Sequence, residues 1–242
     1  MRLLTVEQLS KAFGGLMAIH NLDFYVDEGE IVGIIGPNGS GKTTALNLIT
    51  GFLKPNHGKI TFQGEDITGL ARYTINQKGI ARTFQLCKPF LDFTALQNVL
   101  VGRVYGKDPC VNMKVAELES REILDQVGLI SKAEILVKDL TVMERKRLEL
   151  ARALATKPTL LLLDELMAGL NLAEADDACQ LIMRIRDSKI TIIMVEHIVK
   201  AVTSISDRLF VLNMGEKIAE GPPKEIVHDP KVIEVYLGKS HA

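Results

Sequence analysis

Apolar and polar positions alternate in short runs along the first part of the chain, which is the pattern of β-strands. The runs LLTVEQL, LDFYV and EIVGIIG predict three strands, and the polar stretch VDEGE predicts the turn between the second and the third. GKITFQGEDI predicts two further short strands or a hairpin around Gly64. The chain is therefore expected to begin as a mostly β structure.

The pattern changes at about Thr94, where apolar residues begin to recur at three- and four-residue spacing and predict helices. After Pro158, apolar runs such as TLLLLDE and ITIIMVEH alternate with helical stretches. Strands that are apolar throughout and separated by helices are typical of a parallel sheet covered on both faces. The predicted fold class is α/β, a single domain in which residues 1–87 and 156–242 form a core with an N-terminal antiparallel β-subdomain and residues 88–155 form an inserted helical subdomain.

The composition of the 242-residue chain is that of an ordinary globular protein, with 47% apolar and 24% charged residues. A net charge of −1 gives no electrostatic reason to expect nucleic acid as a partner. Cys87, Cys110 and Cys179 share no close spacing, so reduced thiols are expected rather than a metal site or a disulfide framework. No apolar stretch approaches the roughly 18 to 20 residues that cross a bilayer, so any membrane role is expected to come through a partner.

A glycine-rich loop follows the third predicted strand and carries the first chemical signal. IVGIIGPNGSGKTT contains the phosphate-binding pattern Gly36-x-x-x-x-Gly41-Lys42-Thr43 between a buried strand and a helix, the setting that this motif requires. Glycines let backbone N–H groups point at an anion, the helix N-terminus adds partial positive charge, Lys42 reaches the β and γ phosphates, and the Thr43 hydroxyl can ligate Mg²⁺. The residues expected to contact the nucleotide are Gly36, Pro37, Asn38, Gly39, Ser40, Gly41, Lys42, Thr43 and Thr44. A chance glycine turn would not bring strand, motif and helix together, so the chain is predicted to bind a nucleoside triphosphate as a P-loop NTPase.

Two acids, Asp164 and Glu165, stand at the end of the apolar run LLLLDE. In α/β sheets, ligands sit at the carboxyl ends of the strands. Asp164 can therefore hold the metal ion, and Glu165 can align an attacking water. Taken alone, the acids also suit the start of a loop or a helix cap, but beside a phosphate-binding loop the metal and catalytic roles are favoured.

A predicted helix begins in LTVMERKRLELARAL, where Thr141 and Glu144 have the spacing of a capping box. Its first turn should offer free backbone N–H groups and a dipole end that suits an anion. The residues Arg145, Lys146 and Arg147 are expected to face water. The expected apolar face consists of Leu148, Leu150, Ala151, Leu154 and Ala155.

Several further positions carry a resemblance to the ATP-binding-cassette (ABC) ATPases along nearly the whole chain. Phe13 lies where that family has an aromatic residue that stacks on adenine, and Gln85 in ARTFQ lies at the Q-loop, which reaches toward Mg²⁺. His197 in MVEH matches the switch histidine, and Asn171 in MAGLN matches the D-loop. Thr141 lies at the signature motif, which in this family contacts the γ-phosphate held by a second ATPase subunit. Each of these residues, taken alone, would more often have a structural role. Together they follow the order of the family's motifs around the phosphate loop and the two acids, and this supports the resemblance.

The resemblance implies an ATPase with ATP and Mg²⁺ as cofactors. Asp164, Gln85 and Thr43 would surround the metal, Glu165 would position water, and His197 would support the transition state, with Gln85 counted among the catalytic residues.

The chain departs from the family pattern at the signature. Val142 and Met143 replace its two glycines, Thr141 replaces its serine, and Leu166 and Asn171 also differ from the common residues. Side chains add bulk where glycine allows a close approach. We therefore expect a competent site of the chain's own and a weakened surface offered to the site of its partner.

Within the family, KAFGGLMAIHNLDF, GIARTFQ and the closing GEKIAEGPPKEIVHDPKVIEVYLG resemble the ATPases of branched-chain amino-acid uptake, with systems for urea and short amides looking alike. The implied partners are a second ATPase subunit in a hetero- or homodimer, membrane permease subunits and an external solute-binding protein. The resemblance implies that the chain is located in the cytoplasm, bound at the inner face of the cell membrane through the permease subunits. Phe90, Leu91 and Phe93 lie in an apolar segment where a permease helix would dock, although simple packing explains them equally well. A regulatory subunit with little turnover and an ABC protein acting on DNA or ribosomes are the competing readings.

Overall fold

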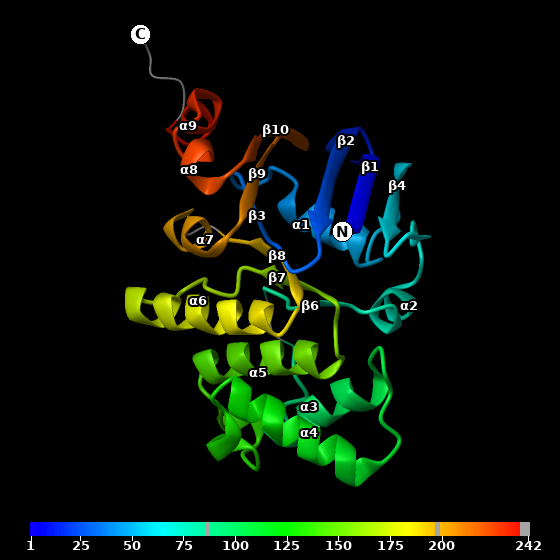
Figure 1. Ribbon diagram of the computed structural model, residues 1–242, viewed down its shortest axis with the longest axis vertical. Coiled ribbons are helices and arrows are strands. Elements are labelled where there is room, and N and C mark those ends of the chain that lie inside the picture. Colours follow the sequence, from blue (N-terminus) through cyan, green and yellow to red (C-terminus); the bar gives the residue numbers. More distant parts are fainter. Residues whose placement is uncertain (86–87, 197–198, 238–242) are drawn as a thin grey trace. The chain divides into compact units, whose positions relative to one another are not determined.

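A computed structural model describes residues 1–85, 88–196 and 199–237 (Figure 1). The chain divides into two compact units, Met1–Arg72 with Met167–Ala242, and Tyr73–Leu166. The predicted division at residues 87/88 and 155/156 stays a prediction. None of the helices in the described part of the chain is long and apolar enough to cross a membrane.

The first unit contains a four-stranded antiparallel sheet in the order β2-β1-β4-β5. Its strands are β1 (Arg2–Phe13), β2 (Leu16–Asp27), β4 (His57–Phe62) and β5 (Glu65–Asp66). Figure 1 shows β1, β2 and β4 side by side, as their pairing requires. The pairing of β4 with β5 confirms the predicted hairpin around Gly64.

The first two strands are much longer than their apolar runs predict. Shifts in register interrupt the pairing of β1 with β2, and Gln8 and Asn21 have positive φ angles of 47° and 46°. Such bulges break the alternation of apolar and polar positions, so the sequence pattern shows only the regular pieces. The two strands form one hairpin that turns at Gly14, and Phe13 and Leu16 face each other at its end.

The first unit also contains four strands in the order β10-β9-β3-β8. These are β3 (Ile31–Ile35), β8 (Thr191–Val195), β9 (Arg208–Asn213) and β10 (Glu216–Gly221). Strand β3 pairs in parallel with β8 and β9, and all residues of β3 and β8 are buried, as expected for strands that are apolar throughout. The pair β9–β10 is an antiparallel hairpin, which the sequence pattern did not separate from the parallel part.

The helices of the first unit are α1 (Lys42–Ile49), α6 (Leu172–Asp187), α7 (Val199–Ile205), α8 (Pro223–Ile226) and α9 (Pro230–Leu237). Helix α7 packs on α6 and on β3, and α8 and α9 pack against β10. Figure 1 shows α8 and α9 next to one another beside the β9–β10 hairpin. The C-terminal helices therefore belong to the unit that holds the glycine-rich loop.

The second unit begins within α2 (Arg72–Gln77) and combines two parallel strands, β6 (Ile80–Arg82) and β7 (Leu160–Asp164), with three longer helices. These helices are α3 (Ala95–Tyr105), α4 (Met113–Gln126) and α5 (Val142–Ala155). Helix α3 packs against both α4 and α5. Two short 3₁₀ turns, η1 (Ile130–Lys132) and η2 (Val137–Asp139), lead into α5.

Buried Asn98 of α3 ties down the segment that precedes its own helix. Its Oδ1 accepts from the Phe90 N–H at 2.9 Å, and its Nδ2 donates to the carbonyls of Phe90 and Thr94 at 3.0 Å each. Thr94 caps the helix in a capping box with Gln97. Local hydrogen bonds of the helix start thus fix the aromatic segment that follows the Q-loop position.

Candidate functional site

The phosphate loop is built so tightly that two of its glycines admit no side chain. A Cβ atom on Gly36 would lie 2.1 Å from the Leu212 carbonyl oxygen, and one on Gly41 would lie 2.7 Å from the Ala18 carbonyl oxygen. Gly39 and Gly41 also have φ angles of 77° and 105°, a region that L-residues avoid. A loop of this kind turns successive N–H groups inward and can cradle an anion.

Helix α1 starts directly after this loop. Its N-cap, Gly41, has no side chain to bond the first-turn N–H groups, so these groups keep their donor capacity for a ligand. Lys42 is 5% exposed, and its Nζ donates to the carbonyls of Gly36 at 2.8 Å and Pro37 at 2.9 Å. The ammonium group therefore lies against the loop, while the Thr43 side chain is exposed.

Phe13, expected to stack on adenine, ends β1 in the same unit as the loop. Its side chain is 46% exposed, and the Lys11 Nζ lies 5.4 Å from its ring centroid. Lys11 is held in turn by a 2.8 Å hydrogen bond to the Lys54 carbonyl. An exposed ring fits a stacking role, because one face is not consumed by core packing.

Asp164 ends β7 and is paired with a residue that the sequence analysis did not single out. Its Oδ2 accepts from the Arg82 Nη2 at 2.7 Å, and both side chains are 4% exposed. The Asp164 N–H donates to the Thr83 hydroxyl at 3.2 Å. Arg82 stands in ARTFQ, three residues before Gln85. Its partner is 82 residues away in the sequence, so no local pattern indicates the pair.

The oxygen donors near Asp164 fit a hard divalent cation. The Asp164 Oδ1 is buried and has no hydrogen-bond partner among the residues that the structure describes. Mg²⁺ binds through one or two carboxylates and substrate phosphates rather than a cage of protein ligands. In keeping with that, no three His, Cys, Asp or Glu side chains cluster as metal ligands within residues 1–85, 88–196 and 199–237.

Glu165 and Gln85 lie together in the second unit. The Gln85 Nε2 donates to the Glu165 Oε2 at 2.5 Å, and Glu165 is 8% exposed. Glu165 has a φ of 52°, a left-handed conformation that costs a non-glycine residue about 1 to 3 kcal/mol. Strained backbone that holds a buried carboxylate is often found at functional sites, so this geometry supports a special role for Glu165.

The predicted start of the signature helix is confirmed. Thr141 is the N-cap of α5, its Oγ1 accepts from the Glu144 N–H at 3.2 Å, and its N–H donates to the Glu144 Oε2 at 2.8 Å. The N–H of Thr141 is the main reason that the pKa of the Glu144 carboxyl is lowered from its ordinary value. A carboxylate therefore already occupies the turn where the sequence suggests an anion site, and Val142 beside it is 72% exposed.

The expected apolar face of α5 is also confirmed, because Leu148, Leu150, Ala151, Leu154 and Ala155 are all buried. The expectation that Arg145, Lys146 and Arg147 face water is wrong, since all three are half-buried. Arg145 donates to the carbonyls of Val137 and Lys138, and Lys146 donates to the Leu166 carbonyl at 3.1 Å. These cations bind backbone carbonyl oxygens of the segments next to the helix instead of facing water.

Of the D-loop and switch-histidine positions, the structure describes only Asn171. Asn171 is the N-cap of α6 and accepts from the Glu174 N–H at 3.0 Å. His197 lies outside the described residues, but its neighbour Glu196 is buried and accepts from the Met167 N–H at 2.7 Å. Sequence reasoning missed Glu196, which stands beside the histidine in MVEH.

The segment after the Q-loop position exposes three apolar side chains. Phe90, Leu91 and Phe93 are 46%, 48% and 43% exposed, and the rings of Phe90 and Phe93 lie 5.2 Å apart. The Arg152 guanidinium lies 5.5 Å from the Phe90 ring centroid and 2.7 Å from the Glu149 carboxylate, which is buried and whose pKa is raised by that burial. About half of each side chain is thus covered by the helical subdomain and about half is exposed.

Comparison with known proteins decides the family. A family model described as ABC transporter matches residues 19–168, and one described as Branched-chain amino acid ATP-binding cassette transporter matches residues 216–242. The chain belongs to the ABC transporter family. As an ABC ATPase it binds nucleotide and couples ATP hydrolysis to transport.

Individual relatives match this ABC ATPase over nearly its whole length. It is 39% identical to the high-affinity branched-chain amino acid transport ATP-binding protein BraF of Pseudomonas aeruginosa, covering 98% of each chain. It is 34% identical to the probable branched-chain amino acid transport ATP-binding protein LivG of Methanocaldococcus jannaschii, covering 99% of this chain and 98% of that one.

Solved structures confirm the α/β P-loop fold class of the ABC ATPase. A nucleotide-free ATP-binding cassette from an ABC transporter and the ADP conformation of the cassette MJ1267 each give a TM-score of 0.89 at 32% identity. Each comparison covers 99% of this chain and 100% of the other.

The buried pair of Arg82 and Asp164 generates a stability prediction. Arg82→Met leaves the Asp164 carboxylate buried without its cation and is expected to lower the free energy of unfolding by about 3 to 5 kcal/mol. Adding Asp164→Leu removes that charge and should restore most of the loss, because an apolar pair often replaces a buried ion pair without cost. Urea unfolding of the single and double variants measures both effects.

Arg121→Met is the matched control, because Arg121 is 38% exposed and pairs with Glu117 and Glu134 at the surface. Its loss should leave the free energy of unfolding nearly unchanged. An Arg82→Met variant as stable as this control would contradict the importance of the buried pair.

Proposed function

We propose that this ABC ATPase energises the uptake of branched-chain amino acids or of related amides or urea. The observation that carries the proposal is the match of residues 216–242 to the model described as Branched-chain amino acid ATP-binding cassette transporter. The names of the relatives in Pseudomonas aeruginosa and Methanocaldococcus jannaschii, which speak of branched-chain amino acid transport, support it. That match lies at the C-terminal end, away from the motifs that every ABC ATPase shares.

We propose that the loop from Gly36 to Thr44 holds the phosphates of ATP and that Phe13 stacks on the adenine. Two close backbone approaches shape the loop, the Lys42 ammonium lies against it, and the Phe13 ring is exposed in the same unit. Backbone N–H groups and the start of α1 supply positive charge for the phosphates.

Asp164, Gln85 and Thr43 are proposed to hold Mg²⁺, which would neutralise charge on the phosphate oxygens when bound. The orphaned Asp164 Oδ1 supports this assignment. Glu165 is proposed as the base that orients water and accepts its proton, and Gln85 positions the Glu165 carboxylate through their hydrogen bond. His197 keeps its proposed role at the γ-phosphate by resemblance.

The proposed assembly has a second ATPase subunit and membrane permease subunits, with an external solute-binding protein in front of them, and places this chain at the cytoplasmic face. A similar structure, cbiO1 of Clostridium perfringens at 27% identity, is described as part of the ABC transporter complex cbiONQ. The exposed Phe90, Leu91 and Phe93 are the proposed permease contact. A pair of aromatic rings held by Asn98 and Arg152 offers a firm apolar surface for a short helix.

The surface that α5 lends to the partner's site is proposed to be weak. Glu144 puts a carboxylate into the first turn, and the side chains of Val142 and Met143 stand where the family has glycines. An anion approaching this turn would meet negative charge and bulk. A heterodimer tolerates one weak composite site, whereas a homodimer would carry the defect twice.

The activity is tested with Glu165→Gln, which keeps the shape of the side chain and the oxygen that accepts from Gln85. Phosphate release at saturating ATP should fall by about 100-fold or more, while the affinity for ATP stays within about threefold. Lys42→Ala is the comparator and should lose ATP affinity itself. Unchanged turnover in Glu165→Gln would show that Glu165 is not the base.

The transported solute is tested by uptake in cells that carry Glu165→Gln as the only copy of this chain. Uptake of radiolabelled leucine, isoleucine and valine should fall to background, while uptake of glutamate should stay unchanged. Loss of urea or acetamide uptake with normal leucine uptake would move the substrate to that related group. The subunits that purify with the chain from membranes identify the partners.

The weak signature surface is tested with Val142→Gly/Met143→Gly. Steady-state hydrolysis and ATP-driven dimerisation should rise by about two- to fivefold, because the backbone of the first turn becomes accessible. The matched control is Met113→Gly/Val115→Gly, which places glycines in the first turn of α4. If neither the isolated chain nor the assembled complex gains activity beyond this control, the substitutions are no defect.

A further inference from the structure

Two residues of the β9–β10 hairpin contact the backbone of the phosphate loop. A Cβ atom on Gly36 would lie 2.1 Å from the Leu212 carbonyl oxygen of β9. The Gly215 N–H donates to the Ser40 carbonyl at 3.0 Å. The loop is thus held at Gly36 and at Ser40 by the C-terminal part of the first unit.

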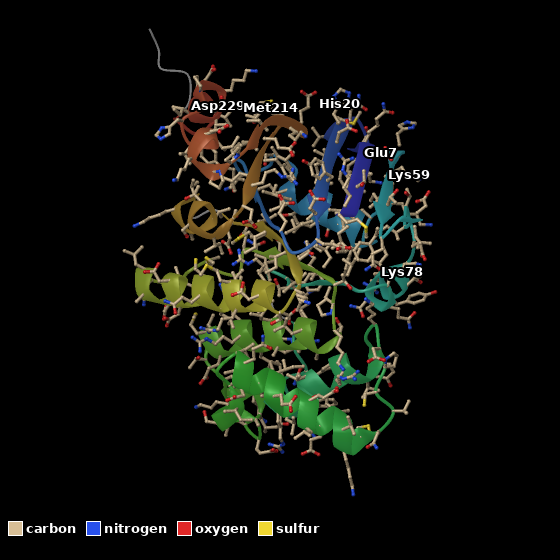
Figure 2. All side chains as sticks on the ribbon, viewed as in Figure 1. Glu7, His20, Lys59, Lys78, Met214 and Asp229 are labelled. Atoms are coloured by element: carbon tan, nitrogen blue, oxygen red, sulfur yellow. The ribbon has the colours of Figure 1, made fainter. Side chains whose placement is uncertain are left out.

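Gly215 also joins the loop to the hairpin that carries Phe13. Its carbonyl accepts from the His20 N–H at 2.9 Å, and the His20 Nδ1 lies 2.7 Å from the Glu216 carboxylate. Figure 2 labels His20 on β2 and Met214 on the β9–β10 turn at neighbouring places. One residue therefore bonds the phosphate loop through its N–H and the proposed adenine hairpin through its C=O.

The geometry of this turn is demanding. Met214 and Gly215 are the two residues between β9 and β10, and both have positive φ angles, 47° and 84°. A positive φ is unfavourable for methionine. Because the Met214 side chain is 83% exposed, its own burial does not compensate for this conformation. A Cβ on Gly215 would lie 2.8 Å from the Ala18 carbonyl oxygen. The contacts of Gly215 with Ser40, His20 and Ala18 hold the turn in this conformation.

We propose that Leu212 and Gly215 form a C-terminal clamp that holds the phosphate loop in its binding shape, with Gly215 as the positioning residue. The proposal rests on the proposed role of this loop as the phosphate site. A loop that is held before binding loses little freedom when nucleotide arrives, so the clamp raises affinity without touching the ligand. Through Gly215, the clamp also links the phosphate loop to the Phe13 hairpin, in addition to the direct contact between Gly41 and the Ala18 carbonyl.

The first test is Gly215→Ala in the full-length chain, with ADP and ATP as probes in isothermal titration calorimetry. The added Cβ must push the turn away from Ala18, so the Kd for both nucleotides should rise by about 5- to 20-fold. Amide hydrogen exchange of residues 36–42 should become faster without nucleotide. In the assembled complex, the KM for ATP should rise while kcat at saturating ATP changes by less than about twofold.

Gly64→Ala is the matched control for the strain of the turn itself. Gly64 lies in the hairpin turn between β4 and β5, has a φ of 80°, and has no atom within 4 Å of its Cβ position. It should lose stability like any residue with this φ, yet leave the nucleotide Kd and the exchange of residues 36–42 unchanged.

Gly215→Asn is the second test, because asparagine adopts positive φ angles more readily than alanine and so avoids a folding defect. Its Cβ still meets the Ala18 carbonyl, so the ADP Kd should rise and exchange of residues 36–42 should become faster, as in Gly215→Ala. Gly64→Asn, at a turn position with open space, should do neither.

The clamp is overturned if Gly215→Ala binds nucleotide like Gly64→Ala, or if Gly215→Asn exchanges and binds like Gly64→Asn. Should Gly215→Ala fail to fold, the Gly215→Asn result alone decides. Unchanged nucleotide affinity in Lys42→Ala has a different meaning, because it would show that the loop is not the phosphate site at all.

Discussion

The close approach of backbone to backbone around the phosphate loop is the constraint on which the rest of this ABC ATPase depends. Gly36 lies against the Leu212 carbonyl, and Gly41 lies against the Ala18 carbonyl. These contacts bring β2, β9 and the loop after β3 to one place, so the antiparallel sheet and the parallel strands of the first unit meet at the loop. A larger residue at either glycine would force apart segments that are far from each other in sequence.

The second unit keeps two acidic side chains buried by giving each of them a partner. Asp164 is paired with Arg82, and Glu165 is hydrogen-bonded to Gln85. Both partners come from the short segment that contains β6 and the ARTFQ motif. The second unit therefore holds its acids in place with its own residues, and this explains how carboxylates can stand at the end of a strand as apolar as β7.

Local patterns were sufficient for much of this structure. The buried runs predicted β3, β7 and β8, the glycine spacing predicted the loop, and the capping box predicted the start of α5 at Thr141. The Arg82 pair and the contacts of Gly215 were missed, because each joins segments that are far apart in sequence. The β9–β10 hairpin is local, but its turn residues Met214 and Gly215 lack the usual Asn-Gly or Asp-Gly signal. Bulges hid the length of β1 and β2 for the opposite reason, since they broke a local pattern. The roles of the site residues stay predictions.

Two positions that the resemblance assigns to the signature motif and the D-loop also begin helices in this chain. Thr141 starts α5 and Asn171 starts α6, and each side chain accepts a hydrogen bond from the third residue of its helix. Serine, threonine, aspartate and asparagine are strongly preferred at such positions, and replacing one of them by alanine costs about 0.5 to 2 kcal/mol. Helix capping alone therefore favours a short polar side chain at Thr141 and at Asn171, whereas it sets no such requirement at Val142 or Met143.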